Sequence, residues 1–364
     1  MSLETILNKD SFSKSDIVQL LNTDFDDRNT LFKYASEIKK KYVDSKTYFR
    51  GLIEYSNVCG KNCLYCGIRR GNKNLTRYTL SDEEIIKSAK FAMDNNYGSI
   101  VLQGGEIESE KNTARINNLI LKMMEMSDGK LGITLSLGEQ SFDTYKLWKD
   151  SGAKRYLLRI ETSSRKLYKL IHPDDEKHNF DKRVECLKNL KDIGYQVGTG
   201  VMVGFPWQTA EDIAGDVLFI KEMDVDMIGL GPYLVHKDTP LYQHREVLLP
   251  LEERFILTLK LISILRIMMK DINIAASTAM QSIDKFGREK AIKAGANIIM
   301  PNITPGQYRD LYKLYENKPC TDEEAEDCLN CMEVRISIAG DEIGLGSQGD
   351  SIHFQKRQKL HLNS

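Results

Sequence analysis

The chain has 364 residues, of which 41% are hydrophobic and 28% charged, so it can bury the core of one large α/β domain or two average ones. Its 51 basic and 52 acidic residues nearly cancel, which argues against partners recognised through a strong overall field, such as nucleic acid or a membrane surface. The N-terminus has no apolar run typical of a signal peptide, and Lys260 and Arg266 interrupt the most apolar stretch. We therefore expect a cytoplasmic protein with small or specific partners.

Residues 1–45 have a mixed, largely helical character and predict an N-terminal helical extension. Between residues 46 and 310, strand-like runs alternate with helical stretches. After the first run, a capping box at Ser81 and Glu84 begins an amphipathic helix that Gly98 ends. Eight such runs predict a closed parallel (β/α)8 barrel of the TIM type rather than a doubly wound sheet. We place the strands at residues 48–56, 98–103, 132–136, 155–161, 197–204, 226–231, 272–276 and 297–301.

Polar residues gather along these strands. On the first strand, alternation places Arg50 and Glu54 on one face, which in a barrel points into the lumen because helices cover the other face. Barrel enzymes keep their sites at the C-terminal mouth, so we expect the polar set near that mouth; structural salt bridges across the lumen are the alternative. The pattern continues at Thr134, Ser136, Arg159 and Glu161.

Residues 311–364 predict a C-terminal extension. A tyrosine-rich stretch leads to a second group of cysteines. The segment beyond about residue 340 is rich in Gly, Ser and charge, which predicts a flexible tail.

Six of the seven cysteines fall into two tight groups. In a reducing compartment such groups indicate metal ligation, because disulfide frameworks belong mainly to small secreted domains. Cys186 stands apart, among apolar residues at helical spacing, and is interpreted as a small buried hydrophobe. The two groups are Cys59, Cys63 and Cys66, and Cys320, Cys328 and Cys331.

The first group has C-x3-C-x2-C spacing directly after the first predicted strand. Structural zinc sites normally need four protein ligands, so three closely spaced thiolates fit an iron–sulfur cluster better. A [4Fe-4S] cluster held by three cysteines leaves one iron open. An open metal position is a reactive one.

This motif, with Tyr65 before the third cysteine, resembles the radical S-adenosylmethionine (SAM) superfamily. The resemblance implies that SAM chelates the open iron and that one electron cleaves it to a 5′-deoxyadenosyl radical, for which the three cysteines are the catalytic ligands. It also implies SAM contacts from other residues: the Gly104–Gly105–Glu106 element for the methionine ammonium, Glu161 for the ribose, Arg183 for the carboxylate and Tyr65 for the adenine. Ser136 and Arg159 are further candidates, Arg159 either through SAM itself or by orienting Glu161.

Seven segments, among them "IEYSNVCGKNCLYCGIRRGNKNLTRY", "MVGFPWQT" and "IMPNITPGQYR", narrow the resemblance to the [FeFe]-hydrogenase maturases called HydE, over roughly residues 30–335. Cys320, Cys328 and Cys331 have C-x7-C-x2-C spacing, as in family members that carry an auxiliary iron–sulfur cluster. Zinc at this acidic site, which we expect at the surface, is the alternative.

The resemblance implies a substrate in which a cysteine-bound iron carries carbon monoxide and cyanide, on the way to the diiron centre of the hydrogenase. Other maturases, and an electron donor such as a ferredoxin or flavodoxin, are the implied partners. Preformed donors inside a dry cavity bind anions well. The candidate anchors for the substrate are Arg50, Thr134, Ser277, Thr278, Tyr308 and Arg309.

Three other functions are weighed against this one. Biotin synthase needs a sulfur-donating cluster ligated from the barrel, and none of the predicted strands carries a cysteine. A methylornithine synthase-like mutase, which acts on an amino acid, would not be expected to carry the second cysteine group. A non-catalytic electron-transfer or cluster-carrier protein is disfavoured by the incomplete ligand set and by the size of the barrel.

Overall fold

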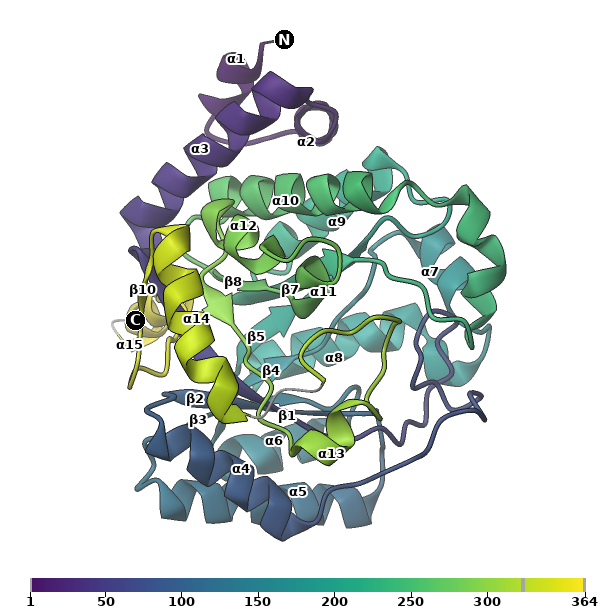
Figure 1. The fold of residues 1–364 in the computed structure, drawn as a ribbon, viewed down its shortest axis with the longest axis vertical. Helices are drawn as coiled ribbons and strands as arrows, with labels where there is room; N and C mark the ends of the chain where they lie inside the picture. The colour runs from purple at the N-terminus through teal and green to yellow at the C-terminus, as the bar shows by residue number, and fades with distance from the viewer. Residues whose placement is uncertain (1, 322–324, 363–364) are drawn as a thin grey trace.

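The structure is a computed structural model that describes residues 2–321 and 325–362, without the side chains of residues 325–331 and 361–362. Eight parallel strands close into a barrel in the order β1–β2–β3–β4–β5–β7–β8–β9, and β9 pairs back onto β1 (Figure 1). The predicted (β/α)8 barrel is confirmed. The strands are β1 Lys46–Ser56, β2 Ser99–Gly104, β3 Gly132–Ser136, β4 Ala153–Leu157, β5 Gln196–Thr199, β6 Met202–Val203, β7 Met227–Pro232, β8 Asn273–Ala276, β9 Ile298–Ile299 and β10 Glu342–Ile343.

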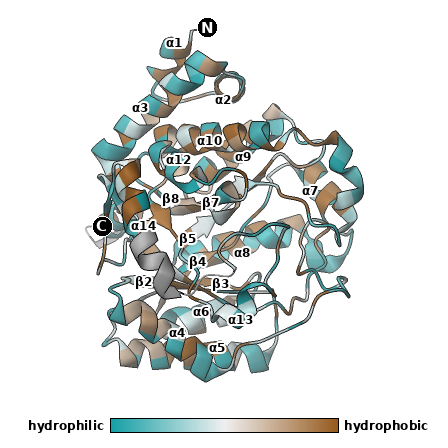
Figure 2. Cartoon of the chain, viewed as in Figure 1, coloured by the Kyte–Doolittle hydropathy of each residue, from teal (hydrophilic) through white to brown (hydrophobic). Residues whose placement is uncertain are grey.

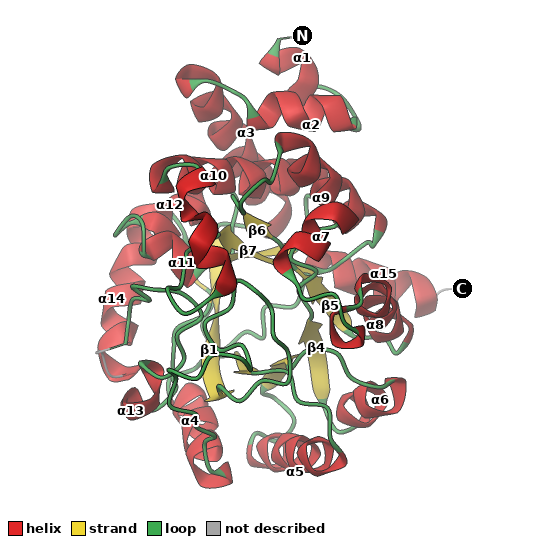
Figure 3. Cartoon of the chain, turned by 90° about the vertical axis from the view of Figure 1, so that its right-hand side faces the viewer, coloured by secondary structure: helices red, strands yellow, loops and turns green. Residues whose placement is uncertain are grey.

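Helices surround the strands (Figure 3), and hydrophilic residues predominate on their outer turns (Figure 2). The helices are α1 Leu3–Leu7, α2 Lys14–Leu21, α3 Phe25–Val43, α4 Asp82–Asp94, α5 Glu110–Met126, α6 Phe142–Asp150, α7 Arg165–Ile171, α8 Phe180–Asp192, α9 Ala210–Glu222, α10 Leu251–Met268, α11 Thr278–Gln281, α12 Gly287–Lys293, α13 Gly306–Arg309, α14 Ala325–Ala339 and α15 Ile352–Leu362. Two 3-10 helices, η1 Glu176–His178 and η2 Pro240–Val247, complete the set.

β9 is shorter than predicted, and two other predicted strands depart from regular strand geometry near their ends. β4 ends at Leu157, and Glu161 contributes only an isolated bridge to Val201. Glu161 has a positive φ of 65°, which a regular strand does not accommodate. The predicted strand 197–204 divides into β5 and β6 at Gly200, where a Cβ atom would lie 1.8 Å from the Gly229 carbonyl oxygen. Both irregularities lie toward the C-terminal ends of the strands, where the chain turns toward the cavity.

The most apolar stretch of the sequence is α10, a buried helix of the barrel wall. The two charged residues of this helix form hydrogen bonds with backbone carbonyls. Lys260 donates to the Leu21 and Thr23 oxygens, and Arg266 donates to the Gly295 and Ile272 oxygens. Nowhere in the part of the chain that the structure describes is a helix both long and apolar enough to span a membrane.

The N-terminal helices lie at one end of the molecule (Figure 1), where α3 packs on α10 and α2 packs on α9. Lys39 of α3 is buried and pairs with Asp341 at 2.5 Å, next to β10. This ion pair joins the two extensions on the outside of the barrel.

Residues 341–362 contain a strand and a helix that contact the barrel, whereas their composition predicts a flexible tail. β10 pairs with the beginning of β1, and α15 is the last helix of the described residues. Between them, residues 346–351, which we call the C-terminal strap, cross the N-terminal end of the barrel. The strap binds the first lumen-facing polar residues of four strands. Arg50 and Asn273 donate to the Gly349 carbonyl, Arg155 pairs with Asp350, and Gln196 accepts from the Ser351 amide.

Acidic residues on the barrel surface hold α15 through His353. The His353 ring lies 3.2 Å from Asp271 and 2.7 Å from Asp224, and hydrogen bonds to these carboxylates raise the pKa of His353 above its ordinary value. The ion pairs of protonated His353 therefore stabilise the folded state fully below the unfolded-state pKa of this histidine. This stabilisation is lost as the pH rises through the folded-state pKa. We therefore expect the free energy of unfolding to fall as the pH rises through and above the ordinary titration range of histidine. Urea unfolding of wild type and His353→Asn should show a weaker pH dependence in the variant; equal slopes would contradict this assignment.

Candidate functional site

The first cysteine group lies on a long loop after β1, residues 57–77, which we call the cluster loop. Cys59, Cys63 and Cys66 all line a single cavity of about 340 Å³ at the C-terminal mouth of the barrel. Arg77 fixes the shape of the loop by donating to the carbonyls of Asn57 (2.6 Å), Ile68 (2.8 Å), Arg69 (2.6 Å) and Asn72 (3.2 Å). A guanidinium group can hold several carbonyls at once because its donors form a rigid fork.

The loop is joined to the glycine element at the end of β2. The Glu106 amide donates to the Cys59 thiol sulfur at 3.3 Å, and the Gly60 amide donates to the Glu106 carbonyl at 2.8 Å. A Cβ atom on Gly105 would lie 2.1 Å from the Val58 carbonyl oxygen. The two backbones therefore touch only because residue 105 is glycine.

Gly105→Ala is expected to reduce SAM cleavage at least about tenfold, because the added methyl group must push the cluster loop away from β2. The measurement is the rate of 5′-deoxyadenosine formation by the reconstituted enzyme. Gly215→Ala is the matched control, since a Cβ atom there would find its nearest neighbour at 3.8 Å. Equal rates for Gly105→Ala and wild type would show that the close contact has no role in the site.

Burial raises the pKa of all three loop cysteines, that of Cys63 to about 12. Without a metal, the thiols are therefore protonated at neutral pH. Iron binding must displace these protons, which couples loading of the loop to pH. Three thiols on one loop, facing one cavity beside a glycine backbone, fit the three-cysteine iron–sulfur site that the sequence predicts.

Four charged side chains form a network beside the thiols. Glu106 lies 2.9 Å from Lys61 and 3.2 Å from Arg183, and Glu139 lies 2.8 Å from both cations. All four side chains are about nine-tenths buried or more, and their charges balance. Glu106 and Arg183 were predicted; Glu139 and Lys61 were missed. Glu139 follows the β3 residues whose pattern pointed to Ser136, but a single acidic residue in a loop gives no periodic signal.

The predicted SAM residues Ser136, Arg159 and Glu161 also line the cavity. Arg159 and Glu161 form a bidentate ion pair with a closest distance of 3.0 Å. Tyr65 lies edge-on to His172, with its hydroxyl 3.4 Å from the Nε2 atom. Burial lowers the pKa of His172 to about 3, so this ring is neutral. His172 was missed by sequence analysis, because a single histidine at the end of a helix is more often structural.

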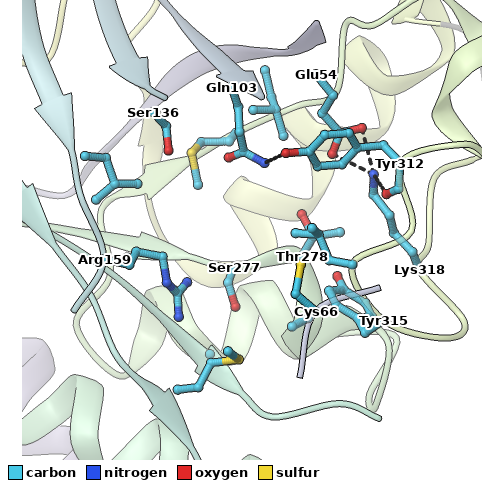
Figure 4. Close-up of a pocket in the computed structure, with 18 of the residues that line it drawn as sticks. Glu54, Cys66, Gln103, Ser136, Arg159, Ser277, Thr278, Tyr312, Tyr315 and Lys318 are labelled. Carbon is cyan, nitrogen blue, oxygen red and sulfur yellow. Dashed lines mark hydrogen bonds and ion pairs between the residues drawn. The ribbon is translucent and has the colours of Figure 1, made fainter. Parts of the chain in front are cut away.

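The opposite wall comes from the C-terminal extension (Figure 4). Lys318 reaches into the barrel and contacts both carboxylate oxygens of Glu54, at 2.6 and 2.7 Å, while Asn302 donates to the same carboxylate at 3.0 Å. The Tyr312 hydroxyl accepts from Gln103 at 3.4 Å. Residues 311–320 therefore form part of the cavity wall, although the sequence placed them outside the barrel.

Of the six predicted substrate residues, two line the cavity and four do not. Ser277 and Thr278 line the cavity, and the buried Ser277 hydroxyl has no hydrogen-bond partner within the described residues. Arg50 and Thr134 line a separate, much smaller pocket near the strap, so their predicted position at the mouth is wrong. The other two residues also lie outside the cavity lining. Tyr308 stacks on Tyr78 and donates to Glu84, and the fully buried Arg309 donates to the Thr304 carbonyl.

Cys320 of the second cysteine group also lines the cavity, where Arg288 approaches its sulfur at 3.5 Å. This corrects the expectation that the whole group lies at the surface. Cys328 and Cys331 belong to α14, but their side chains lie outside the described residues, so the C-x7-C-x2-C prediction is not tested as a ligand set. Cys186 is buried on α8, as predicted.

Comparison with known proteins identifies the family. Residues 53–220 match the radical SAM superfamily. Over 310 residues the chain is 44% identical to the [FeFe] hydrogenase maturase subunit HydE of Thermotoga maritima, and the match covers 85% of each protein. The chain belongs to the HydE family of radical SAM proteins. Members of this family are SAM-dependent iron–sulfur enzymes, so the predicted enzyme class is confirmed, and membership implies a [4Fe-4S] cluster and SAM.

More distant relatives share the fold. Biotin synthase of Clostridium botulinum is 27% identical over 301 residues, covering 80% of this chain and 88% of that protein. The crystal structure of methylornithine synthase superimposes with a TM-score of 0.80 at 23% identity, covering 95% of this chain and 98% of that one. The structure of the maturase HydG from Carboxydothermus hydrogenoformans gives a TM-score of 0.78 at 19% identity, covering 99% and 82%. At these identities the two structures establish the barrel and nothing about the substrate.

Proposed function

We propose that this HydE family member cleaves SAM reductively and acts on a cysteine-bound iron that carries carbon monoxide and cyanide, as a step in assembling the diiron centre of [FeFe]-hydrogenase. The observation that supports it is the continuous cavity of about 340 Å³, which connects the three loop thiols with a wall of polar donors. A volume of this size falls within the range of small-ligand sites. The 44% identity to a curated HydE supports the choice of substrate class.

The cluster loop and the end of β2 form the proposed SAM site. Cys59, Cys63 and Cys66 would hold the cluster. When bound, the cluster and SAM supply the 5′-deoxyadenosyl radical that attacks sulfur on the substrate. The chain's own residues orient SAM: the Gly104–Gly105 backbone and Glu106 face its methionine end, and the remaining predicted contacts surround the rest of the molecule. These contacts are Tyr65, Ser136, Arg159, Glu161 and Arg183.

The proposed charge roles depend on the pairs seen in the structure. Arg183 is shared by Glu106 and Glu139, so a carboxylate that binds Arg183 must compete with two anions in a buried setting. The Arg159–Glu161 pair holds the Glu161 carboxylate in one orientation, which supports a ribose contact by Glu161 with Arg159 as its positioning partner. Arg159 is therefore proposed to act through Glu161.

The proposed substrate anchors are Ser277 and Thr278. The unpartnered Ser277 hydroxyl is a donor available to a cyanide nitrogen or a carboxylate oxygen. Because buried polar groups are usually hydrogen-bonded, an orphan hydroxyl that faces a cavity is where a ligand is expected. Arg50, Thr134, Tyr308 and Arg309 are not included among the anchors, because they do not line this cavity.

The second cysteine group is proposed to hold an auxiliary iron–sulfur cluster, with Cys320 at the cavity wall and Cys328 and Cys331 on α14. A ferredoxin or flavodoxin is the proposed electron donor, and other hydrogenase maturases are the proposed partners in supplying the substrate and receiving the product.

The test is anaerobic reconstitution with iron and sulfide, followed by SAM and dithionite, with and without the cysteine-bound iron carbonyl cyanide complex. The expected result is faster SAM consumption with the complex, and an adenosyl group attached to its sulfur. Equal rates with and without it would overturn the substrate assignment, and lysine would then test a mutase activity. Absence of any SAM cleavage would favour a non-catalytic iron–sulfur carrier.

A further inference from the structure

The short 3-10 helix η1 holds the cluster loop at two consecutive residues. Lys61 donates its ammonium group to the Lys177 carbonyl, and the Asn62 amide lies 2.9 Å from the Nε2 atom of His178. The next residue along the loop is Cys63. η1 connects α7 with α8, so these contacts reach the loop from a part of the chain far away in sequence.

The hydrogen bond to Asn62 determines the state of the His178 ring. A backbone N–H can only donate, so Nε2 must be an unprotonated acceptor. The hydrogen of the neutral ring is then on Nδ1, which lies 2.6 Å from the Asp175 carboxylate. Burial lowers the pKa of His178, and the effect of Asp175 opposes it. The contacts together describe a neutral imidazole in a single tautomer.

Because His178 is buried, loss of its hydrogen bond with the Asn62 amide is expected to destabilise the cluster loop. The His178 side chain is 2% exposed, whereas that of Asp175 is 45% exposed. If His178 were absent, the Asn62 amide would lose its acceptor at a part-buried contact. The neighbouring contact does not replace it, because the Lys61 ammonium is itself a donor and cannot accept from the Asn62 amide.

We propose that His178, oriented by Asp175, is a positioning residue for the iron–sulfur cluster. It fixes the peptide that precedes Cys63, and with it the direction of the Cys63 thiol and of the iron that SAM must reach. The role rests on the proposed assignment of the three loop cysteines to the cluster. It does not depend on the identity of the iron-containing substrate.

The first test uses the metal-free chain, so that it is independent of activity. His178→Gln keeps a carbonyl acceptor near the position of Nε2, and His178→Phe keeps the ring without an acceptor. Asp174→Asn is the matched control, because Asp174 is the exposed neighbour of Asp175. Hydrogen exchange of the peptide containing residues 59–66 is expected to be about tenfold faster at Asn62 in His178→Phe, and close to wild type in the other two. Wild-type exchange in His178→Phe would overturn the proposal.

The second test uses the reconstituted enzyme with SAM alone. His178→Phe is expected to raise the KM for SAM about tenfold and to change the electron paramagnetic resonance spectrum of the reduced cluster with SAM bound. His178→Gln should restore most of both properties, which general destabilisation of the fold would not explain. An unchanged spectrum and KM in His178→Phe would overturn the positioning role. If wild type itself cleaves no SAM, the proposed function is wrong. The hydrogen-exchange experiment still tests whether His178 accepts a hydrogen bond from the Asn62 amide.

The third measurement covers the case in which His178→Phe does not fold. Nitrogen NMR of wild type labelled with ¹⁵N-histidine is expected to show one ring with a protonated Nδ1 and a hydrogen-bonded, unprotonated Nε2 at neutral pH. Its signals should be missing from His178→Gln, which assigns them. A ring at this position that carries its hydrogen on Nε2, or on both nitrogens, would overturn the proposal.

Discussion

Cys63→Ala is expected to abolish SAM cleavage, with at least about a 100-fold loss of 5′-deoxyadenosine formation. The reason is that the cluster needs three thiolate ligands and the variant offers only two. Cys63 is the central cysteine of the C-x3-C-x2-C motif, and Arg77 and η1 hold the loop around it by hydrogen bonds. Its removal also opens space next to the network of Lys61 and Glu106. The measurement is SAM consumption with dithionite after anaerobic reconstitution, with iron content determined in parallel.

The control is Cys328→Ala, which should keep most of the SAM cleavage because Cys328 belongs to the second cysteine group on α14. Cys186→Ala is a second control, since Cys186 is a buried core residue on α8. It should change stability rather than the chemistry. Equal loss of SAM cleavage in Cys63→Ala and Cys328→Ala would mean that the assignment of the chemistry to the first cysteine group alone is wrong.

The cluster loop could be predicted from sequence because its signal is local. The spacing of Cys59, Cys63 and Cys66 lies within eight residues, and the glycine element follows the next strand. Parallel strands place their C-terminal ends at one edge, so residues after β1, β2, β3 and β4 must meet. The same rule correctly placed Ser136, Arg159 and Glu161 at the cavity.

The position of a residue along the barrel axis could not be predicted from alternation. Arg50 and Glu54 share the lumen-facing side of β1, but four residues of strand separate them by roughly 13 Å. Glu54 therefore lines the cavity, whereas Arg50 lies near the strap. Thr134 and Ser136 differ in the same way over a shorter distance. Period-two patterning determines the face of a strand and leaves the depth undetermined.

Contacts between distant segments also escaped prediction. Lys318 and Glu54 are 264 residues apart, and neither one indicates the other from sequence. The contacts of the strap escaped prediction for a related reason: its Gly and Ser content is typical of flexible chain, but the barrel strands present buried polar partners for its backbone and for Asp350. Composition indicates whether a segment would be ordered in isolation, but it does not show the tertiary contacts that the rest of the fold provides.

Asp350→Ala is expected to lower the free energy of unfolding by about 3 kcal/mol, because it leaves a buried guanidinium without its carboxylate. Arg155 is fully buried at the N-terminal end of the barrel, and Asp350 is its ion-pair partner at 2.6 Å. The same carboxylate accepts from Gln196, so the substitution removes two contacts of the strap at once. Arg50, which is also buried, lies close enough for the Asp350 charge to stabilise it.

The matched control is Lys356→Ala, which removes an ion pair from the same tail at the surface. The Lys356 side chain is 58% exposed and pairs with Asp271 at 2.7 Å. Exposed pairs of this kind contribute less than about 1 kcal/mol, since water already solvates both charges. Urea unfolding followed by circular dichroism should therefore separate the two variants by about 2 kcal/mol or more. If Asp350→Ala is as stable as Lys356→Ala, the strap does not stabilise the N-terminal end of the barrel, and another group must compensate the charge of Arg155.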